Sequence, residues 1–542
     1  MIYLDIETNL KHNQIWLCVT KKGSEVIHWR DPKGLQQYIG NSQVCAHNGI
    51  GFDYPILRQV WGVQIRKSQA VDTLIMSRLH NPVIEGGHSL KAWGKRLGAE
   101  KMEFDITDFD AGWSEEMAEY CERDVEVLAN LHSHLVREFK QWRNNGKEPL
   151  ELEHEVAIIL SRMERTGFKI DLDKAKQMES DLVSEMESIT HQLQEVFPPI
   201  IEERWSEKTG KRLKDKTIVF NPGSRKQIAE RLEALGVDFD KFTEKGNVII
   251  DDVVLGSIDL PEAKVLARYF FLQKRHGLVT SWLKATKEDG RVHGRINSLG
   301  AVTNRCTHSS PNMAQIPSDH DCREVWTVAE GRKLVGSDLS GIELRCLAHY
   351  MQDEAYTKEL LEGDIHTANQ EAAGLPTRNN AKTFIYAFLY GAGEAKLGSI
   401  VGGGSKEGAK LKQAFFRKIP SMKKLIDKVK KLSQKGYVPA MDGRRIQVKS
   451  EHSALNMLLQ SAGAIVAKQW LVESQKQVVR NKLDAKLVAF VHDETQWDCA
   501  GKDADKLAEI LVKAAETAGE QLGFRLKVAA ESAIGESWAD TH

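Results

Sequence analysis

The four-residue spacing of two cations and two phenols between positions 378 and 390 constrains the local fold more than any other feature. Arg378, Lys382, Tyr386 and Tyr390 occupy every fourth position of the stretch R-N-N-A-K-T-F-I-Y-A-F-L-Y. On an α-helix this spacing places the four side chains along one stripe. Such a stripe can hold a triphosphate with its cations and a base or sugar with an aromatic ring. Taken alone, the segment fits an ordinary amphipathic helix with solvated charges better than a nucleotide site.

Length and composition limit the class of protein. A chain of 542 residues exceeds one ordinary core and predicts about three or four domains. Hydrophobic residues make up 41% and charged residues 28%, as in soluble globular proteins, and no apolar run approaches the roughly 20 residues of a membrane span. Asp5 and Glu7 interrupt the N-terminal apolar stretch, which excludes a secretory signal. The seven cysteines form no C-x-x-C pair, which argues against disulfides and zinc and favours a reducing cytoplasm.

The net charge of -1 hides a strongly basic segment. Eleven Lys and Arg residues fall between Lys406 and Lys435 against two acids, Glu407 and Asp427, and Arg444, Arg445 and Lys449 follow. This pattern predicts a basic surface, either for a phosphate backbone or simply for solubility. A smaller basic loop is predicted from Arg204 to Lys216.

The order of elements predicts two large bodies joined by a helical segment. Residues 1 to about 140 indicate an α/β unit with strands at Ile2–Ile6 and Val44–Asn48 and a helix at Glu115–Phe139. Residues 144–146 indicate a linker, and a long helical pattern with a turn at 166–167 follows to Val196. A short helix is expected from Ser224 to Leu235, and strands and helices alternate from about residue 290 to the end.

Two carboxylates near the N-terminus predict a metal site. In Asp5-Ile6-Glu7 the acids alternate with an apolar residue on a predicted strand, so both side chains leave the same face. Two carboxylates held together favour a hard divalent cation such as Mg²⁺ or Mn²⁺. Asp53 and Asp124 offer further carboxylates, with Tyr120 one helical turn before Asp124. Such a cluster can hold two metal ions and activate water against a phosphodiester.

A second pair of acids flanks the cationic helix. Leu334–Asp338 predicts a strand that ends in an acid and precedes a helix at Ile342–Tyr350. Val488–Val491 predicts a strand that turns at Asp493 and returns as Thr495–Cys499. Each aspartate alone resembles an ordinary turn residue. Together with the helix between them, they provide the groups for metal-dependent nucleotidyl transfer.

The N-terminal motifs resemble those of a nuclease family. D-I-E, N-x-x-x-x-D and Y-x-x-x-D are similar to the three motifs of DnaQ-like 3'-5' exonucleases. This resemblance implies that Asp5, Glu7, Asp53 and Asp124 are metal ligands and that Tyr120 orients the attacking water. Every motif position carries the expected residue type, so the resemblance implies an active proofreading site.

The rest of the chain resembles the family A (Pol I-like) DNA polymerases, in particular the replicative type of T-seven-like bacteriophages. D-L-S-G-I-E-L-R is similar to motif A, R-x3-K-x3-Y-x3-Y-G to motif B, and V-H-D-E to motif C. The implied fold is α/β and α+β multidomain, an RNase H-like exonuclease domain followed by a right-hand polymerase domain. The implied domains are exonuclease 1–142, the start of the polymerase domain with the thumb 150–290, palm with motif A 291–365, fingers with motif B 366–440, and palm with motif C 441–542.

The resemblance also implies roles for single residues in the polymerase domain. Asp338 and Asp493 would hold two Mg²⁺ ions, with the carbonyl of Leu339, and the exonuclease site would hold two more, Mn²⁺ being a substitute. Nucleotide contacts would come from Arg378, Lys382 and His366 at the triphosphate, Tyr386 at the sugar and base, and Glu343 against a 2'-hydroxyl. Contacts to primer-template DNA would come from Arg305, Tyr390, Asn456, Gln460 and His492.

The resemblance implies a template-directed DNA polymerase that extends a primer with dNTPs and proofreads its product. Phage genome replication in the cytoplasm of a bacterial host, beside a helicase-primase, is the expected setting. A single-subunit RNA polymerase and a stand-alone DNA exonuclease are the alternatives; Glu343 as a 2'-hydroxyl gate argues against the first. Because Tyr386 carries a phenol where other family members carry Phe, we expect weak discrimination against dideoxynucleotides.

The chain departs from its phage relatives in the thumb. Those relatives carry a long insertion that binds the host's thioredoxin, whereas about twenty residues, 197–216, fill that place here. Thioredoxin is therefore not expected as a partner. Lys208, Lys211, Arg212, Lys214 and Lys216 either contact duplex phosphates or belong to a solvated loop. No 5'-nuclease domain precedes Asp5, so nick translation is not expected.

Overall fold

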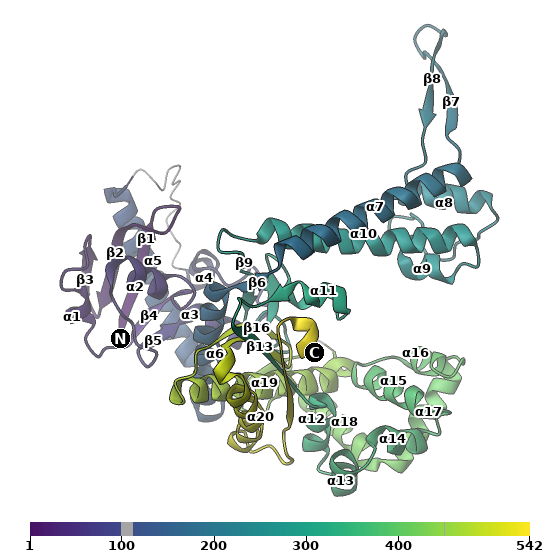
Figure 1. The fold of residues 1–542 in the computed structure, drawn as a ribbon. Helices are drawn as coiled ribbons and strands as arrows, with labels where there is room; N and C mark the ends of the chain where they lie inside the picture. The colour runs from purple at the N-terminus through teal and green to yellow at the C-terminus, as the bar shows by residue number, and fades with distance from the viewer. Residues whose placement is uncertain (99–111, 449) are drawn as a thin grey trace. The chain divides into compact units, whose positions relative to one another are not determined.

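The computed structural model describes residues 1–98, 112–448 and 450–542, so Lys449 of the basic segment lies outside the described residues. The chain forms two compact units (Figure 1). Unit 1 comprises Met1–Phe168, Gly294–Gln315 and Val328–His542, and unit 2 comprises Lys169–His293 and Ile316–Thr327. Among the described residues, no helix is long and apolar enough to cross a membrane.

The N-terminal part of unit 1 is built on a five-stranded sheet of order β3-β2-β1-β4-β5. Strand β1 is central, antiparallel to β2 and parallel to β4. The elements are β1 Ile2–Thr8, β2 Ile15–Lys22, β3 Glu25–Trp29, α1 Leu35–Ile39, β4 Val44–Ala46, α2 Asp53–Trp61, β5 Ala70–Asp72, α3 Thr73–His80, α4 Leu90–Leu97 and α5 Glu115–Phe139.

The alternation in β1 produces the predicted two-faced strand. Ile2, Leu4 and Ile6 are buried, whereas Asp5 and Glu7 are only partly buried on the opposite face. Ser114 caps helix α5, its hydroxyl accepting from the Met117 N–H at 3.1 Å, and the helix packs on β1 and β2. The predicted strand at 2–6 and the predicted helix at 115–139 are confirmed.

The central part of unit 1 is a four-stranded antiparallel sheet of order β16-β17-β13-β18, with α6 and α20 packed against its strands and α19 packed on these two helices. The predicted strand ending at Asp338 and the predicted hairpin around Asp493 are both confirmed as parts of this sheet. The elements of this central part of unit 1 are η1 Arg143–Gly146, α6 Lys147–Thr166, β10 Arg295–Asn297, β11 Thr307–Ser309, η2 Met313–Gln315, β13 Arg332–Leu339, β14 Tyr437–Pro439, β15 Arg445–Gln447, η3 Glu451–Ser453, α19 Ala454–Arg480, β16 Ala485–Val491, β17 Glu494–Ala500, η4 Gly501–Asp503, α20 Ala504–Gln521, β18 Ala530–Gly535 and η5 Trp538–Thr541.

A buried ionic cluster ties α6 to α19 and to the turn before β15. The carboxylate of Glu153 accepts from Arg444 Nη1 at 2.6 Å and from Lys468 Nζ at 2.8 Å, and Asp442 accepts from Arg444 Nε at 2.8 Å. Arg444 is fully buried. The prediction that Arg444 belongs to a basic surface is therefore wrong, because its side chain is buried and paired with the carboxylates of Glu153 and Asp442.

A group of helices carries the cationic stripe. Its elements are α12 Ile342–Met351, α13 Glu354–Glu362, α14 Ile365–Ala373, α15 Arg378–Leu389, α16 Glu394–Ser399, α17 Ser405–Lys418 and α18 Pro420–Ser433. Thr377 caps helix α15, and its hydroxyl accepts from the Asn380 N–H at 3.0 Å. Phe384 and Phe388 pack on Phe415 of α17 with ring centroids 5.5 and 5.9 Å apart. This packing turns the opposite face of α15 outward.

Unit 2 is an elongated helical body with a small sheet and a projecting hairpin. Its elements are β6 Phe168–Ile170, which begins at the last residue of unit 1, α7 Leu172–Val196, β7 Ile200–Trp205, β8 Arg212–Ile218, α8 Arg225–Ala234, α9 Asp252–Ser257, α10 Pro261–Ala285, β9 Arg291–Val292, α11 His320–Glu324 and β12 Trp326–Thr327. Leu193, Phe197, Phe220 and Leu266 contribute to its core. Residues 200–218 form an antiparallel ribbon rather than the expected loop, since Ile200 pairs with Ile218 and Trp205 with Arg212.

Candidate active sites

A row of carboxylates crosses the four-stranded sheet of unit 1 at the end of β13. Asp338 lies opposite Glu494 of β17 on one side and opposite Glu531 of β18 on the other. Asp493 stands in the tight turn between β16 and β17, and its carbonyl accepts from the Leu339 N–H at 3.0 Å. Directly opposed residues share a face of a sheet, so the register brings Asp338, Glu494 and Glu531 together, and the hydrogen bond from Leu339 brings the Asp493 turn to the same end of the sheet.

The electrostatics of this edge are unfavourable for ionised acids. Burial, Glu343 and Asp338 raise the pKa of Asp493 to about 6, against an opposing effect of Arg305. Partial burial, Glu531 and Glu494 raise the pKa of Asp338, and His542 opposes that rise. Carboxylates that resist ionisation in this way are stabilised by a cation.

The predicted nucleotide residues of α15 line its outward face together with His366. Arg378 and Lys382 are exposed, and Tyr386 is partly buried beside His366 of α14, with ring centroids 6.2 Å apart. Partial burial and the charges of Arg378 and Lys382 lower the pKa of His366. The predicted stripe is therefore present, although the helix ends at Leu389 and Tyr390 follows it as the C-cap.

Arg378 is engaged by an acid in this structure. Its Nε donates to Asp364 Oδ2 at 2.6 Å and its Nη2 to Asp364 Oδ1 at 3.1 Å. The guanidinium holds the pKa of Asp364 well below its usual range. A phosphate that binds Arg378 must compete with this exposed carboxylate.

Glu343 is hydrogen-bonded to Arg305 and Tyr390 and acts electrostatically on Tyr386. Its Oε1 accepts from Arg305 Nη2 at 3.2 Å and also from the hydroxyl of Tyr390. Burial and Glu343 raise the pKa of Tyr390 to about 12. Burial, Glu343 and Asp493 raise the pKa of Tyr386, which places both tyrosines in the field of the same acid.

Asn456 and Gln460, which are predicted to contact DNA, form hydrogen bonds at the end of α15 in this structure. Asn456 Nδ2 donates to the Leu389 carbonyl at 2.8 Å, and Gln460 Nε2 donates to Asn456 Oδ1 at 2.9 Å. His492 occupies the turn beside Asp493 with a left-handed φ of 58°. The Asn456 hydrogen bond connects α19 to the end of the helix that carries Tyr386.

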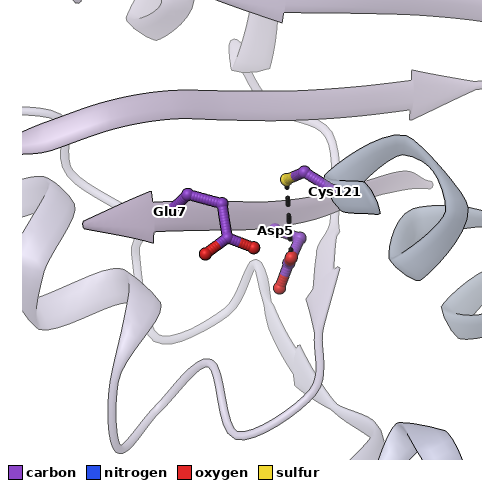
Figure 2. Close-up of side chains that lie close together, drawn as sticks. All are labelled: Asp5, Glu7 and Cys121. Carbon is purple, nitrogen blue, oxygen red and sulfur yellow. Dashed lines mark hydrogen bonds between the residues drawn. The ribbon is translucent and has the colours of Figure 1, made fainter. Parts of the chain in front are cut away.

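The N-terminal acids form a second cluster. Asp5, Glu7 and Cys121 each offer a ligand atom, and the three atoms lie within 4.8 Å of one another (Figure 2). Asp5 and Glu7 come from β1 and Cys121 from α5, and the Cys121 thiol donates to Asp5 Oδ2 at 3.5 Å.

The remaining motif residues surround this cluster at different depths. Asp53 opens α2 and is 3% exposed; burial, Asp72 and Glu7 raise its pKa to about 8. Asp124 is buried on α5, one turn after the partly buried Tyr120. The structure thus brings Asp5 and Glu7 into direct proximity, sets Asp53 in the field of Glu7, and keeps Asp124 on the helix that packs on β1.

Three residues near the sites were not predicted. Cys121 contacts Asp5; its place after Tyr120 was the available signal. Glu531 faces Asp338 only because of the strand register, which no motif reports. His542 Nδ1 lies 3.3 Å from Glu494 Oε2, a carboxylate that also accepts from Gln496 Nε2 at 2.8 Å.

Both clusters fit divalent cations in their donor chemistry. Carboxylate oxygens are the ligands of Mg²⁺, and in both clusters burial combines with neighbouring acids to raise a carboxyl pKa. Burial and the neighbouring acids disfavour the ionised carboxylates, and a bound cation would favour them. The residues present therefore fit the expected metals.

Comparison with known proteins agrees with the geometry. A model of DNA polymerase family A matches residues 184–540. The DNA-directed DNA polymerases of Enterobacteria phage T3 and Escherichia phage T7 are each 30% identical to this chain, covering 92% of it and 92% of each relative. DNA polymerase I of Aquifex aeolicus is 29% identical, covering 99% of this chain and 95% of that protein.

Structural comparison shows a similar fold in a solved protein. The POL domain of Pol1 from M. smegmatis, solved in complex with DNA primer-template and dNTP, has a TM-score of 0.83 at 18% identity, covering 99% of this chain and 95% of that one. The chain belongs to DNA polymerase family A. The predicted family, fold class and polymerase function are confirmed, and neither alternative, an RNA polymerase or a stand-alone exonuclease, finds support.

Proposed function

We propose that this protein extends a DNA primer with dNTPs at the edge where Asp338 and Asp493 meet, and removes mispaired 3' ends at the Asp5–Glu7 cluster. The observation that carries the proposal is the β13–β17 register, which places Asp338 opposite Glu494 and beside the Asp493 turn. The outward face of α15 supplies the cations that an acidic edge alone lacks.

In the polymerase site, Asp338 and Asp493 would hold Mg²⁺, with Leu339 contributing its carbonyl. Two bound Mg²⁺ would neutralise charge on the reacting phosphates during in-line displacement. Arg378, Lys382 and His366 bind the triphosphate, and Arg378 exchanges its bond to Asp364 for one to phosphate. Tyr386 contacts the sugar, and Glu343 excludes a 2'-hydroxyl, held in place by Arg305 and Tyr390.

Contacts to primer-template DNA come from Arg305, Tyr390, Asn456, Gln460 and His492. Minor-groove acceptors occur on every base pair, so such side chains can test pairing geometry without reading sequence. Asn456 and Gln460 already connect α19 to the end of α15, which couples the duplex to the nucleotide helix.

In the exonuclease site, Asp5, Glu7, Asp53 and Asp124 would hold two Mg²⁺, and Tyr120 orients the attacking water. The close approach of Asp5 and Glu7 and the raised pKa of Asp53 support this assignment. Its setting is phage genome replication in the cytoplasm of a bacterial host, beside a helicase-primase and without thioredoxin.

One experiment tests both sites. Purified protein is given a primer-template with dNTPs, and in parallel a labelled single strand, each with and without Mg²⁺. We expect Mg²⁺-dependent extension in the first reaction and Mg²⁺-dependent shortening from the 3' end in the second. Extension without shortening contradicts the exonuclease assignment, and shortening alone contradicts the polymerase assignment.

A further inference from the structure

A pocket between α2 and α6 of unit 1 is separate from the two proposed active sites. Its volume is about 400 Å³. Among the residues that the structure describes, none of those assigned to the two proposed sites lines it. The buried hydroxyl of Ser161 donates to the Ile50 carbonyl at 3.0 Å and joins α6 to the loop before α2. Pockets of about 300 to 1,000 Å³ have the usual size of small-molecule sites.

Three arginines line this pocket. Arg58 lies in the last turn of α2, and Arg162 and Arg165 lie one turn apart on α6. Arg165 Nη1 donates to Ser161 Oγ at 2.6 Å, which holds its guanidinium at the pocket wall. Burial and the charges of Arg162 and Arg58 lower the pKa of Arg165, against an opposing effect of Glu164. The three cations are therefore close enough to repel one another.

The pocket itself does not neutralise these charges. Within the described part of the chain, no acid lines the pocket and no ion pair involves any of the three arginines. A fourth cation of the lining, Lys67, is paired with Glu155 at 2.6 Å. A bound anion would relieve the repulsion among the arginines. Guanidinium groups match the geometry of phosphate oxygens, so phosphate is the anion that this cluster fits best.

Apolar side chains also line the pocket. Ile50 and Tyr54 are buried, and Ile65 and Ile158 are partly buried. The hydroxyl of Tyr54 donates to the Val44 carbonyl at 2.9 Å, which keeps its ring in place. An apolar lining with a few convergent polar groups is typical of a site for an organic ligand. An inorganic phosphate ion would leave the apolar part of the pocket in contact with water.

We propose that this pocket binds a nucleoside phosphate, with the phosphate on Arg58, Arg162 and Arg165 and the base against Ile65 and Ile158. The arginines supply the positive charge, so binding needs no metal ion. Shortening of a DNA strand from its 3' end releases nucleoside monophosphates, and this source of the ligand rests on the proposed exonuclease function. The pocket is a third nucleotide site, beyond the two at which reactions are proposed.

The first test measures dAMP binding to the full-length protein in EDTA, so that neither acid cluster holds a metal ion. Isothermal titration calorimetry at low salt compares the parent with a variant that combines Arg58→Gln, Arg162→Gln and Arg165→Gln. We expect Kd to rise by at least about 100-fold, because three charge-assisted contacts to phosphate are lost. An unchanged Kd in the variant, or no binding of dAMP to the parent, overturns the proposal.

A matched control replaces three exposed arginines elsewhere in unit 1, Arg137, Arg480 and Arg525, with Gln. The net charge change is identical in the two variants, and circular dichroism checks that both are folded. We expect the control to bind dAMP with the parent Kd. An equal loss of affinity in the control shows an effect of overall charge and overturns the proposal.

Ile158→Trp is a second variant, which narrows the pocket and keeps all three arginines. We expect dAMP binding to weaken by at least about 10-fold and the binding of inorganic phosphate to stay at the parent level. Equal affinity of the parent for dAMP and phosphate contradicts the proposed base contact. Tighter binding of a single-stranded oligonucleotide than of dAMP, lost in the triple arginine variant, assigns the pocket to a DNA strand and overturns the proposal.

Photolabelling with 8-azido-dAMP in EDTA, followed by peptide mapping, locates the bound ligand. We expect label within residues 50–70 or 158–165 that excess dAMP prevents. Label confined to the peptide with Arg378 and Lys382 overturns the proposal. These assays use neither Mg²⁺ nor a primer-template. Failure of primer extension or of 3'-end shortening therefore contradicts the proposed function and not the pocket, so the two failures are distinguishable.

Discussion

The two acid clusters assemble paired carboxylates in opposite ways. Asp5 and Glu7 are two positions apart on β1, and strand alternation alone puts them on one face. Asp338 and Asp493 come from distant segments, and only the β13–β17 register and the turn after β16 bring them together. The first pair is a local property of the chain, whereas the second exists only in the folded sheet.

The surroundings of the clusters differ as well. The N-terminal cluster has a buried neutral thiol, Cys121, beside Asp5, and its Asp53 is almost completely buried. The sheet edge adds further acids, Glu494 and Glu531, beside a more exposed Asp338. In both clusters burial is the largest cause of the raised pKa, and neighbouring acids raise it further, Asp72 and Glu7 at Asp53 and Glu531 and Glu494 at Asp338.

Asp493→Ala is the sharpest test of the sheet-edge site. Loss of one of two aspartates removes several kcal/mol of charge stabilisation, which we expect to slow primer extension by about 10⁴-fold. Single-strand degradation should remain at the parent level because the N-terminal cluster is untouched. Rapid-quench extension assays measure the first quantity, and Glu509→Ala on the exposed face of α20 is the control. Measurable extension by Asp493→Ala at the parent rate contradicts the site assignment.

Asp5→Ala combined with Glu7→Ala should show the reverse pattern. Because Asp53 and Asp124 remain, we expect a smaller loss, about 10³-fold, in single-strand degradation, with extension unchanged. Degradation of a 3'-labelled strand under single-turnover conditions measures it. The matched control is Glu115→Ala with Glu119→Ala, two exposed acids of α5. A parallel loss of extension would show that the two sites are not independent.

Tyr386→Phe tests whether the phenol hydroxyl affects the choice between a dideoxynucleotide and a deoxynucleotide at the sheet-edge site. We expect the ratio of dideoxy to deoxy incorporation to fall by about 10- to 100-fold, since a hydrogen bond to a charged group contributes about 1.5 to 3 kcal/mol. Competition between ddNTP and dNTP at a single template position gives the ratio. Tyr356→Phe, which removes a phenol hydroxyl from nearby α13, should leave it unchanged. An unchanged ratio in Tyr386→Phe means that the phenol does not replace the missing 3'-hydroxyl.

The difference between the clusters also explains what the sequence predicted. Strand β1, helix α5 and the α15 stripe follow from local periodicity, and the structure has them where periodicity places them. Glu531 was missed because its proximity to Asp338 depends on the pairing of β13 with β18, which periodicity does not encode. Arg444 was misplaced because its partner Glu153 lies on α6, far away in the chain. The ribbon at 200–218 was missed because its strands lack an apolar face.

The smallest expected effect is on thermal stability without metal, and its pH dependence should differ between the two clusters. The pKa of Asp53 is about 8 and that of Asp493 about 6, both above the ordinary value of an Asp carboxyl. A raised folded pKa means that ionisation opposes folding: the cost is absent below about pH 4, grows as pH rises, and is complete above the folded pKa. Asparagine at either position removes this cost.

In EDTA at pH 8.5, Asp53→Asn and Asp493→Asn should each raise Tm by about 2 to 6 °C, with the larger gain for Asp53→Asn. The gain of Asp493→Asn should fall as pH drops through about 6 and vanish near pH 4, whereas that of Asp53→Asn should already decline below about 8. Scanning fluorimetry across this pH range measures both, with the exposed Asp505→Asn as control. Mg²⁺ should raise the Tm of the parent and so reduce the difference in Tm between the parent and each variant. A pH-independent gain would show that packing, and not charge, limits stability at both clusters.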